Sequence, residues 1–252
     1  MSGRVVKIAL LADVHANSEA LSACLEHARG QEPDRYVFLG DLVGYGPDPE
    51  SVLETIEAAV ARGGIAVLGN HDLAVARGAS ARMHEEARRA IEWTRSRLGA
   101  GHLQFLAGLP VAVEENGCLY VHANAWAPAE WEYIDGEVDA ARSMRATLCR
   151  RTFCGHVHTP ALYHMAEAGR AVHFAPTPGT RIPLGSRRCW LGIVGSVGQP
   201  RDGNPAACYA LLEEPPAFLT FFRVPYDYET AARRMRQAGL PPGLSARLSK
   251  GI

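Results

Sequence analysis

Residues Lys7–Asn17 read KIALLADVHAN, and this stretch decides the fold. The apolar run from Val5 to Ala12, broken only by Lys7, has the length of a strand that is buried on both faces. Because alternate side chains of a strand share a face, we expect Asp13 and His15 to project together from its carboxyl end, where open α/β sheets bind ligands. A carboxylate oxygen beside an imidazole nitrogen suits a divalent transition metal. In the alternative interpretation, Asp13 and Asn17 only cap the helix that follows.

The composition is that of an ordinary globular protein. The 252 residues are 47% hydrophobic and 21% charged, which suits one large domain, and we expect it to span residues 1–252. The formal net charge of −1 provides no basic field, so general nucleic-acid binding is not expected. The sequence has no apolar run of about 18 residues, so no membrane helix is expected either.

The cellular location is predicted from the N-terminus and the cysteines. The N-terminus enters the first strand without the cationic region, hydrophobic segment and cleavage site of a secretory signal. The six cysteines lack the spacing of a zinc site or a disulfide framework, and several, such as Cys154 and Cys189, lie in apolar runs. We therefore expect reduced thiols and a cytoplasmic protein.

The first half of the chain alternates strands and helices. After the first strand, the sequence predicts a helix to about Arg29, a strand over residues 35–39, a helix over residues 48–62 and a strand over residues 65–68. A polar cluster follows each strand. This βαβ order predicts a mostly parallel sheet.

The second half is dominated by short strands. A long amphipathic helix is expected over residues 80–98, then a hairpin around Asn116-Gly117 and a helix over residues 137–148. Short strands follow from Thr152 onward, and from about residue 226 a C-terminal helix and a proline-rich tail should pack on the domain. Two sheets packed face to face with helices outside would bury both halves. The predicted fold class is therefore α/β, a four-layer α/β/β/α double β-sheet sandwich in a single domain.

Oxygen and imidazole donors follow several of the predicted strands. They are Asp13, His15, Asp41, Asn70, His71, His122, His156 and His158. A single histidine is usually an ordinary core or surface residue, but this placement recurs from strand to strand. Glycines at three of the strand ends permit tight turns and close approach of the backbone. The pattern therefore indicates a metal centre.

The motifs D-x-H, G-D, G-N-H-D, a lone V-H and G-H-x-H occur in this order between Val6 and about Thr159, and they resemble the signature of the calcineurin-like metallophosphoesterases. The resemblance implies a double β-sheet sandwich flanked by helices. It also implies two divalent metal ions of manganese or iron type, with zinc, nickel or magnesium as other options. By motif position, one metal would be held by Asp13, His15 and His158, the other by Asn70, His122 and His156, with Asp41 bridging the two.

Phosphoester hydrolysis explains these residue types. Two divalent ions roughly 3.5–4 Å apart can share one hydroxide and clamp a phosphoryl group for in-line attack. A bridging carboxylate serves both cations, and the neutral Asn70 keeps the charge of the site favourable for an anionic substrate. The resemblance implies that His71 faces the leaving-group oxygen, where an imidazole can donate a proton.

The sequence departs from the protein Ser/Thr phosphatase branch of this family close to His71. Gly44 stands where an orienting aspartate would lie, and Asp72 stands where that branch has glutamate. The candidates for orienting His71 are Asp48 and Asp72, although each is also suited to cap a helix.

Two glycine-containing loops follow predicted strands. The loop GYGPDP after Asp41 lacks the third glycine of a dinucleotide-binding loop, and we reject that interpretation. The segment Gly195–Gly203, GSVGQPRDG, resembles a loop of a bacterial and archaeal subgroup of the family. Either it is only a hairpin loop, or its backbone N–H groups and Arg201 bind phosphate. Asn17 and Arg201 are the predicted substrate contacts.

The predicted function is hydrolysis of a phosphodiester or nucleotide-type substrate by a metal-bridging hydroxide, with His71 assisting the leaving group. The expected partner is a small phosphorylated molecule, with a nucleotide as one candidate. One alternative is a non-catalytic metal-binding scaffold of the same fold, and another is a phosphomonoesterase acting on proteins or nucleotides. A nuclease would need a basic path, whereas the arginines of the second half are expected in solvated positions. They are Arg142, Arg145, Arg150 and Arg151.

Overall fold

Two six-stranded sheets pack face to face in the computed structural model, which describes residues 4–80, 83–166 and 169–252. Across the first sheet the strands are β3 (Ile65–Ala66), β2 (Arg35–Phe38), β1 (Val6–Leu11), β11 (Ala207–Glu214), β12 (Phe218–Val224) and β9 (Arg181–Pro183). Across the second they are β4 (Ala112–Glu115), β5 (Cys118–Val121), β6 (Arg151–Cys154), β10 (Arg188–Ile193), β7 (Ala161–Ala166) and β8 (Val172–Phe174).

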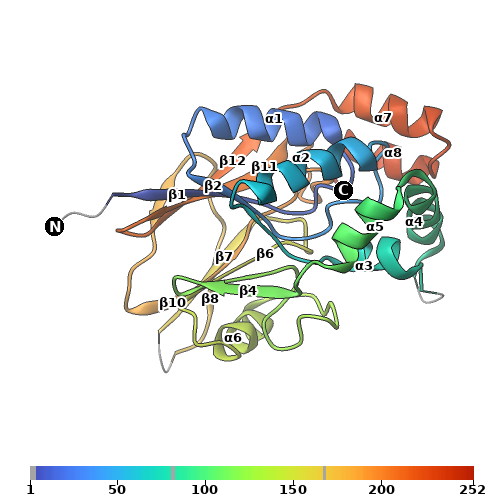
Figure 1. Cartoon of the computed structure of the whole chain (residues 1–252). Helices are drawn as coiled ribbons and strands as arrows, with labels where there is room; N and C mark the ends of the chain where they lie inside the picture. Colours follow the sequence, from blue (N-terminus) through green and yellow to red (C-terminus); the bar gives the residue numbers. More distant parts are fainter. Residues whose placement is uncertain (1–3, 81–82, 167–168) are drawn as a thin grey trace.

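Helices cover the outer faces of both sheets and one end of the sandwich. They are α1 (Ser18–Arg29), α2 (Pro49–Ala61), α3 (Asn70–Arg77), α4 (Glu85–Arg97), α5 (Ala100–Ala107), α6 (Glu137–Arg145), α7 (Tyr228–Gln237) and α8 (Pro242–Leu248). Figure 1 shows α1, α2 and α7 above the first sheet and α6 below the second. The predicted α/β/β/α order of layers is confirmed.

Strand β1 is buried on both faces, as its apolar run predicts. Leu10 points into the core between the sheets, where it joins Phe153 of β6. Leu11 points the other way, into the core under α1 and α2 that contains Leu21. A third core packs α6 against the outer face of the second sheet.

The sheets are mixed because the two halves of the chain interleave. Parallel pairing in the first sheet is limited to β1, β2 and β3, so the predicted mostly parallel sheet is only half of it. On its other side β1 pairs antiparallel with β11, a strand of the second half of the chain. This pairing places the residues just before β11 against those just after β1.

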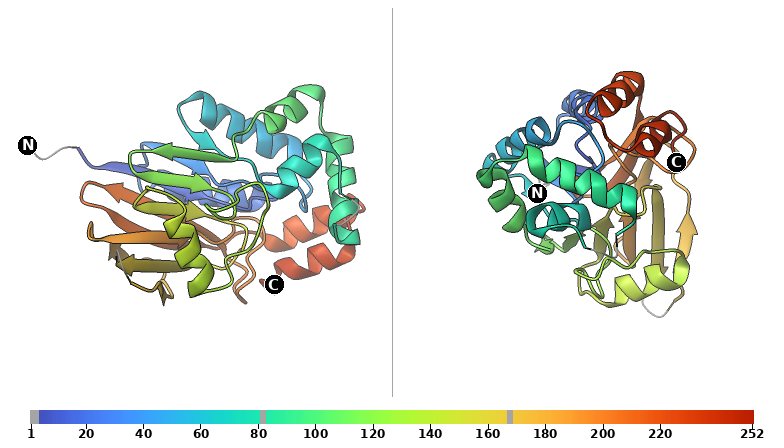
Figure 2. Two further views of the ribbon diagram at one scale, coloured as in Figure 1. Left: turned by 90° about the horizontal axis from the view of Figure 1, so that it is seen from below. Right: turned by 90° about the vertical axis from the view of Figure 1, so that its right-hand side faces the viewer.

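Several element boundaries differ from the predicted ones. The helix predicted over residues 80–98 begins at Glu85, and its residues 81 and 82 lie outside the described part of the chain. Helix α5 and strand β9 were not predicted. The proline-rich tail forms α8, which lies beside α7 and α4 (Figures 1 and 2). Residues of these three helices share one core cluster with Tyr45.

Two predicted absences concern location. No helix in the described part of the chain has both the length and the apolar character that a membrane crossing requires. The described cysteines form no disulfide.

Candidate metal centre

The predicted ligands meet where the carboxyl ends of strands from both sheets converge. In one group, ligand atoms of Asp13, His15, Asp41 and His158 lie within 4.8 Å of one another, and in a second group the same holds for Asp41, His122 and His156. Asn70 joins the second group, because its Oδ1 lies 3.2 Å from His122 Nε2. The fold thus brings all the predicted ligands together, with Asp41 in both groups.

The backbone that carries these ligands is strained. Asp13 and His15 follow β1 in a loop, where both have a φ near +50°, rather than in the extended strand whose alternation predicted their common direction. Their N–H groups donate to Gly40 O and Asp41 O, which ties this loop to the loop after β2. The predicted ligands in the left-handed region are Asp13, His15, Asp41, His156 and His158. Such conformations cost about 1–3 kcal/mol each and concentrate at functional sites.

Asp41 faces both groups of ligands. Its Oδ1 accepts a hydrogen bond of 2.8 Å from His71 N. Its Oδ2 lies 3.4 Å from His122 Nε2 and 3.8 Å from His15 Nε2. A Cβ atom on Gly69 would lie 2.2 Å from Asp41 Oδ1, so only glycine permits this approach. The geometry is that of a carboxylate placed to bridge two cations.

Backbone carbonyl groups determine which ring nitrogens of His122 and His156 face each other. His122 Nδ1 lies 2.8 Å from Leu39 O, and His156 Nε2 lies 2.9 Å from Trp131 O, so these nitrogens carry the protons. When both imidazoles are neutral, His122 Nε2 and His156 Nδ1 are unprotonated acceptors, and they lie only 3.1 Å apart. Two acceptors at this distance repel each other unless a proton or a metal ion lies between them.

The first group shows the same convergence of acceptors. His158 Nδ1 donates to Gln199 O at 2.6 Å, which leaves Nε2 as a lone pair. That lone pair lies 3.3 Å from Asp13 Oδ1 and 3.2 Å from His15 Nε2. The donor set of both groups therefore fits divalent metal ions.

Burial controls the protonation of these groups in the metal-free protein. It lowers the pKa of His156 to about 3, and it holds the pKa of His15 and His158 well below the usual range. Neutral imidazoles are the form that binds metal. Burial also raises the pKa of the Asp13 carboxyl to about 8. For His122, burial opposes the charged form, but the Asp41 carboxylate raises the pKa to about 9.

The ring of His71 lies next to the predicted ligands and contacts mainly other aromatic rings. Its Nδ1 is buried and has no hydrogen-bond partner among the described residues. Tyr45 packs edge-on against it with ring centroids 4.5 Å apart, and His15 does so at 5.0 Å. A Cβ atom on Gly44 would lie 2.7 Å from that nitrogen, so the backbone of Gly44 covers it.

Neither aspartate predicted as the orienting partner of His71 has that position. Asp72 accepts hydrogen bonds from the backbone N–H groups of Leu42, Val43 and Gly69. Asp48 accepts from the Ser18 hydroxyl and pairs with Arg234. Only the Asp72 carboxylate fixes the backbone around the site. The ring that packs against His71 is that of Tyr45.

The loop over residues 195–203 holds the first group of ligands in place. The N–H groups of Val197 and Gly198 donate to Ala12 O and Asp13 O, and the Ser196 hydroxyl also donates to Asp13 O. These groups are therefore engaged within the protein, which does not support the predicted phosphate cradle of backbone N–H groups.

The two predicted substrate contacts lie close to this loop. The Asn17 side chain accepts from Ala20 N as the cap of α1 and donates to Gly198 O and Tyr226 Oη, so its amide serves the fold, as the capping alternative predicts. Arg201 donates to Gln199 Oε1. After burial, its positive charge is the next influence that lowers the pKa of His158. Arg201 is thus near the centre, and its contact with substrate stays a prediction.

Two of the arginines considered as part of a nucleic-acid binding path have partners within the protein. Arg151 begins β6, whereas His156 and His158 follow the end of that strand, and Arg151 pairs with Glu214. Arg142 lies on α6 and stacks on Trp126. Arg142 also pairs with Glu132, so both guanidinium groups have a carboxylate partner, which does not support a path of free positive charge.

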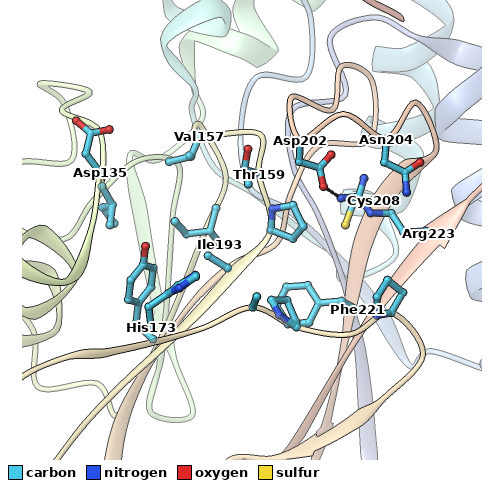
Figure 3. A pocket seen from close by; sticks show the side chains of 17 residues that line it. Asp135, Val157, Thr159, His173, Ile193, Asp202, Asn204, Cys208, Phe221 and Arg223 are labelled. Atoms are coloured by element: carbon cyan, nitrogen blue, oxygen red, sulfur yellow. Dashed lines mark hydrogen bonds and ion pairs between the residues drawn. The ribbon is translucent and has the colours of Figure 1, made fainter. Parts of the chain in front are cut away.

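A cavity of about 650 Å³ lies beside the loop that carries His156 and His158, but neither histidine lines it. Val157 and Thr159 line it, and Asp202 and Arg223 form an ion pair there (Figure 3). None of the predicted ligands lines it. The cavity is therefore separate from the candidate metal centre.

Comparison with known proteins points to one family. The family model described as the calcineurin-like phosphoesterase superfamily domain matches residues 6–215. The chain is also similar to the crystal structure of a metallophosphoesterase from Sphaerobacter thermophilus, with a TM-score of 0.87 and 37% identity over 99% of this chain and 100% of that one.

Two curated relatives extend this comparison. An uncharacterized protein of Methanocaldococcus jannaschii is 32% identical over 250 residues, which cover 97% of this chain and 98% of that protein. A symmetrical bis(5'-nucleosyl)-tetraphosphatase of Bordetella pertussis is 34% identical over 137 residues, which cover 52% of this chain and 49% of that protein.

Proposed function

Because this chain belongs to the calcineurin-like phosphoesterase superfamily, we propose that it is a dinuclear metal-dependent phosphoesterase that hydrolyses a phosphodiester or another nucleotide-type ester. The observation that carries the proposal is the convergence of the two groups of predicted ligands on the shared Asp41 carboxylate. The similarity of half of the chain to a bis(5'-nucleosyl)-tetraphosphatase supports a nucleotide-type substrate.

Two divalent ions bound here would supply the activated water and the positive charge that phosphoryl transfer requires. Manganese or iron is the proposed metal type. The residues that would hold the first ion are Asp13, His15 and His158, those for the second are Asn70, His122 and His156, and Asp41 would serve both.

His71 is the proposed acid for the leaving group. Burial lowers the pKa of its imidazole, so the ring is neutral in the substrate-free protein. A phosphate ester beside the ring would raise that pKa, because a nearby negative charge favours the protonated imidazole. His71 would thus gain a proton on substrate binding and donate it to the departing oxygen.

The test combines metal analysis with hydrolysis of p-nitrophenyl phosphate and bis(p-nitrophenyl) phosphate in the presence of Mn²⁺. The wild type should hydrolyse one or both esters, lose this activity in EDTA and regain it with metal. Asp41→Asn should lose both metal and activity, because the neutral amide no longer offers a shared anion to two cations. Asp135→Asn, a change at an exposed aspartate, is the matched control.

Two outcomes would contradict parts of the proposal. Full metal content in Asp41→Asn would overturn the bridging role of this carboxylate. A wild type that binds both metals but hydrolyses no phosphoester would favour the non-catalytic scaffold.

A further inference from the structure

A groove of about 440 Å³ adjoins the second group of ligands. Asn70 and His156, both predicted ligands, are among the residues that line it. The described residues that line the rest include Leu73, Arg77, Met83, Trp131 and Tyr133, and none of them is acidic. A substrate bound at the metal centre can therefore extend into this groove without meeting a carboxylate there.

Two aromatic rings lie at this junction. The Tyr133 ring stacks on His156 with centroids 4.1 Å apart and an angle of 15° between the planes. Tyr133 is nevertheless 47% exposed and lines the groove, so its side chain is accessible to a ligand there. Trp131 meets His122 edge-on at 5.9 Å. Open aromatic faces beside a phosphate site are suited to stacking of a nucleobase.

The backbone of Trp131 links these rings to the metal centre. Trp131 has a φ of 59°, which is unusual for a bulky residue. Its carbonyl oxygen accepts the proton of His156 Nε2 at 2.9 Å. The backbone of Trp131 thus holds the ring of His156, and its indole packs against His122. Strained backbone of this kind concentrates at functional sites.

Arg77 contributes a positive charge to the same groove. It lies in the last turn of α3, the helix that begins at Asn70, and therefore about two turns from this ligand. Its guanidinium forms no ion pair with any carboxylate of residues 4–80, 83–166 and 169–252. Such a cation favours an anionic ligand over a neutral or cationic one.

We propose that this groove binds the nucleoside part of the substrate, with the base stacked on Tyr133 and Trp131 while a phosphate lies at the metal centre. The inference rests on the proposed phosphoesterase function for the phosphate end of the ligand. It adds the place where the nucleoside part would bind and the residues that would select it.

The first test compares two esters that share the p-nitrophenolate leaving group. Thymidine 5′-(p-nitrophenyl phosphate) carries a base, and methyl p-nitrophenyl phosphate does not. The wild type should prefer the thymidine ester in kcat/KM by about 5- to 150-fold, the range expected for one base–aromatic stack. Tyr133→Ala should lose most of this preference and Tyr133→Phe should keep it. Phe174→Ala, a change at another exposed aromatic ring, should also keep it.

The second test measures binding without turnover. Calorimetry on the Mn²⁺-loaded protein should show tighter binding of adenosine 5′-monophosphate than of inorganic phosphate, and Tyr133→Ala should remove this difference. Because Tyr133 touches a predicted ligand, the metal content of the variant is measured alongside. Leu73→Glu, which adds a carboxylate on the α3 side of the groove, should weaken nucleotide binding independently.

The outcomes separate this inference from the proposed function. Hydrolysis of both esters without preference, together with equal binding of the nucleotide and phosphate, would overturn the nucleoside groove and leave the phosphoesterase in place. Hydrolysis of neither ester, together with no hydrolysis of p-nitrophenyl phosphate or bis(p-nitrophenyl) phosphate, would overturn the phosphoesterase. The calorimetry would still decide whether the groove binds a nucleoside.

Discussion

His71 illustrates how one residue can lie among metal ligands and yet be free for another role. Its N–H group donates to Asp41, which fixes the start of α3, while its ring points toward His15 and Tyr45. Asn70, the preceding residue, points toward His122 instead. Under the proposed function, these adjacent residues at a helix N-terminus would serve metal binding and chemistry separately.

His71→Ala should retain both metals and lose activity in proportion to how much the leaving group needs a proton. General acid catalysis typically contributes about 10²–10⁴-fold, so esters with alkoxide leaving groups should slow by this amount. Esters of p-nitrophenol should slow less. Steady-state rates over a series of leaving groups, with metal content as the control, provide the measurement. Unchanged rates on every ester would leave His71 with a structural role only.

Tyr45 should act as a positioning residue for His71. Tyr45→Leu removes the ring that packs on His71 and His15, whereas Tyr45→Phe keeps it. Aromatic contacts of this kind contribute about 0.5–1.5 kcal/mol, so a loss of roughly 2- to 10-fold in kcat is expected for Tyr45→Leu. The loss should grow with the pKa of the leaving group, as for His71→Ala. An equal loss on all esters would indicate general destabilisation instead.

At the scale of elements, the loop between β10 and β11 connects the two sheets to the metal centre. Ser196 donates to Asp13 O and accepts from Gln199 N, and Gln199 O in turn accepts the proton of His158 Nδ1. One hydroxyl thus supports the positions of ligands from both sheets.

Ser196→Ala should weaken metal binding as well as the fold. It leaves the buried N–H group of Gln199 without its partner, which costs about 1–3 kcal/mol. The Asp13 carbonyl loses one of its two hydrogen bonds and keeps the one from Gly198 N. Denaturant unfolding and metal titration should both show the defect. Ser249→Ala, at an exposed hydroxyl that bonds only to its own helix, is the matched control. A variant with reduced stability but normal metal affinity would contradict the role of Ser196 in placing the ligands.

At the scale of the whole molecule, the metal centre lies between the sheets and should contribute to their association. Chelation leaves the buried carboxylates and imidazoles of the two ligand groups without a cation. Because metal binds the folded chain, its removal should lower Tm, and readdition of Mn²⁺ should restore it. Calorimetric melting curves with and without EDTA provide the measurement, and identical curves would contradict the prediction.

Metal affinity should increase with pH. In the metal-free protein, burial raises the pKa of Asp13 to about 8, and Asp41 raises that of His122 to about 9 against the effect of burial. Metal binding requires both groups without their protons, so up to about two protons should be released per chain at neutral pH. Titrations from pH 6 to 9 in buffers of different ionisation enthalpy measure this release. An affinity that is constant over this range would contradict it.

The same shifts give the sign of the pH dependence of stability without metal. Both pKa values are raised in the folded state, so the folded protein holds these protons more tightly than the unfolded chain. The metal-free fold should therefore lose stability as the pH rises through 8 and 9. The destabilisation caused by EDTA should accordingly be larger at pH 9 than at pH 7.

The sequence by itself determined the donors, their order and the strands that carry them. The run before Asp13 predicts a buried strand because continuous apolar character is a local property. The glycines before Asp41, Asn70 and His156 mark close approaches in the same local way. The resemblance of the ordered motifs to one family also rests on the sequence alone.

Tertiary structure decided what depends on residues far apart in the chain. Antiparallel pairing of β11 with β1 brings Ser196 against Asp13 across 183 residues, which no local pattern indicates. The tautomers of His122 and His156 depend on the carbonyl groups of Leu39 and Trp131, which only the packed sheets and loops supply. The packing of Tyr45 against His71 and the groove beside His156 also depend on how separate segments of the chain pack together. The sequence determines which side chains are present, but the packing of distant segments determines the partners of each buried polar atom.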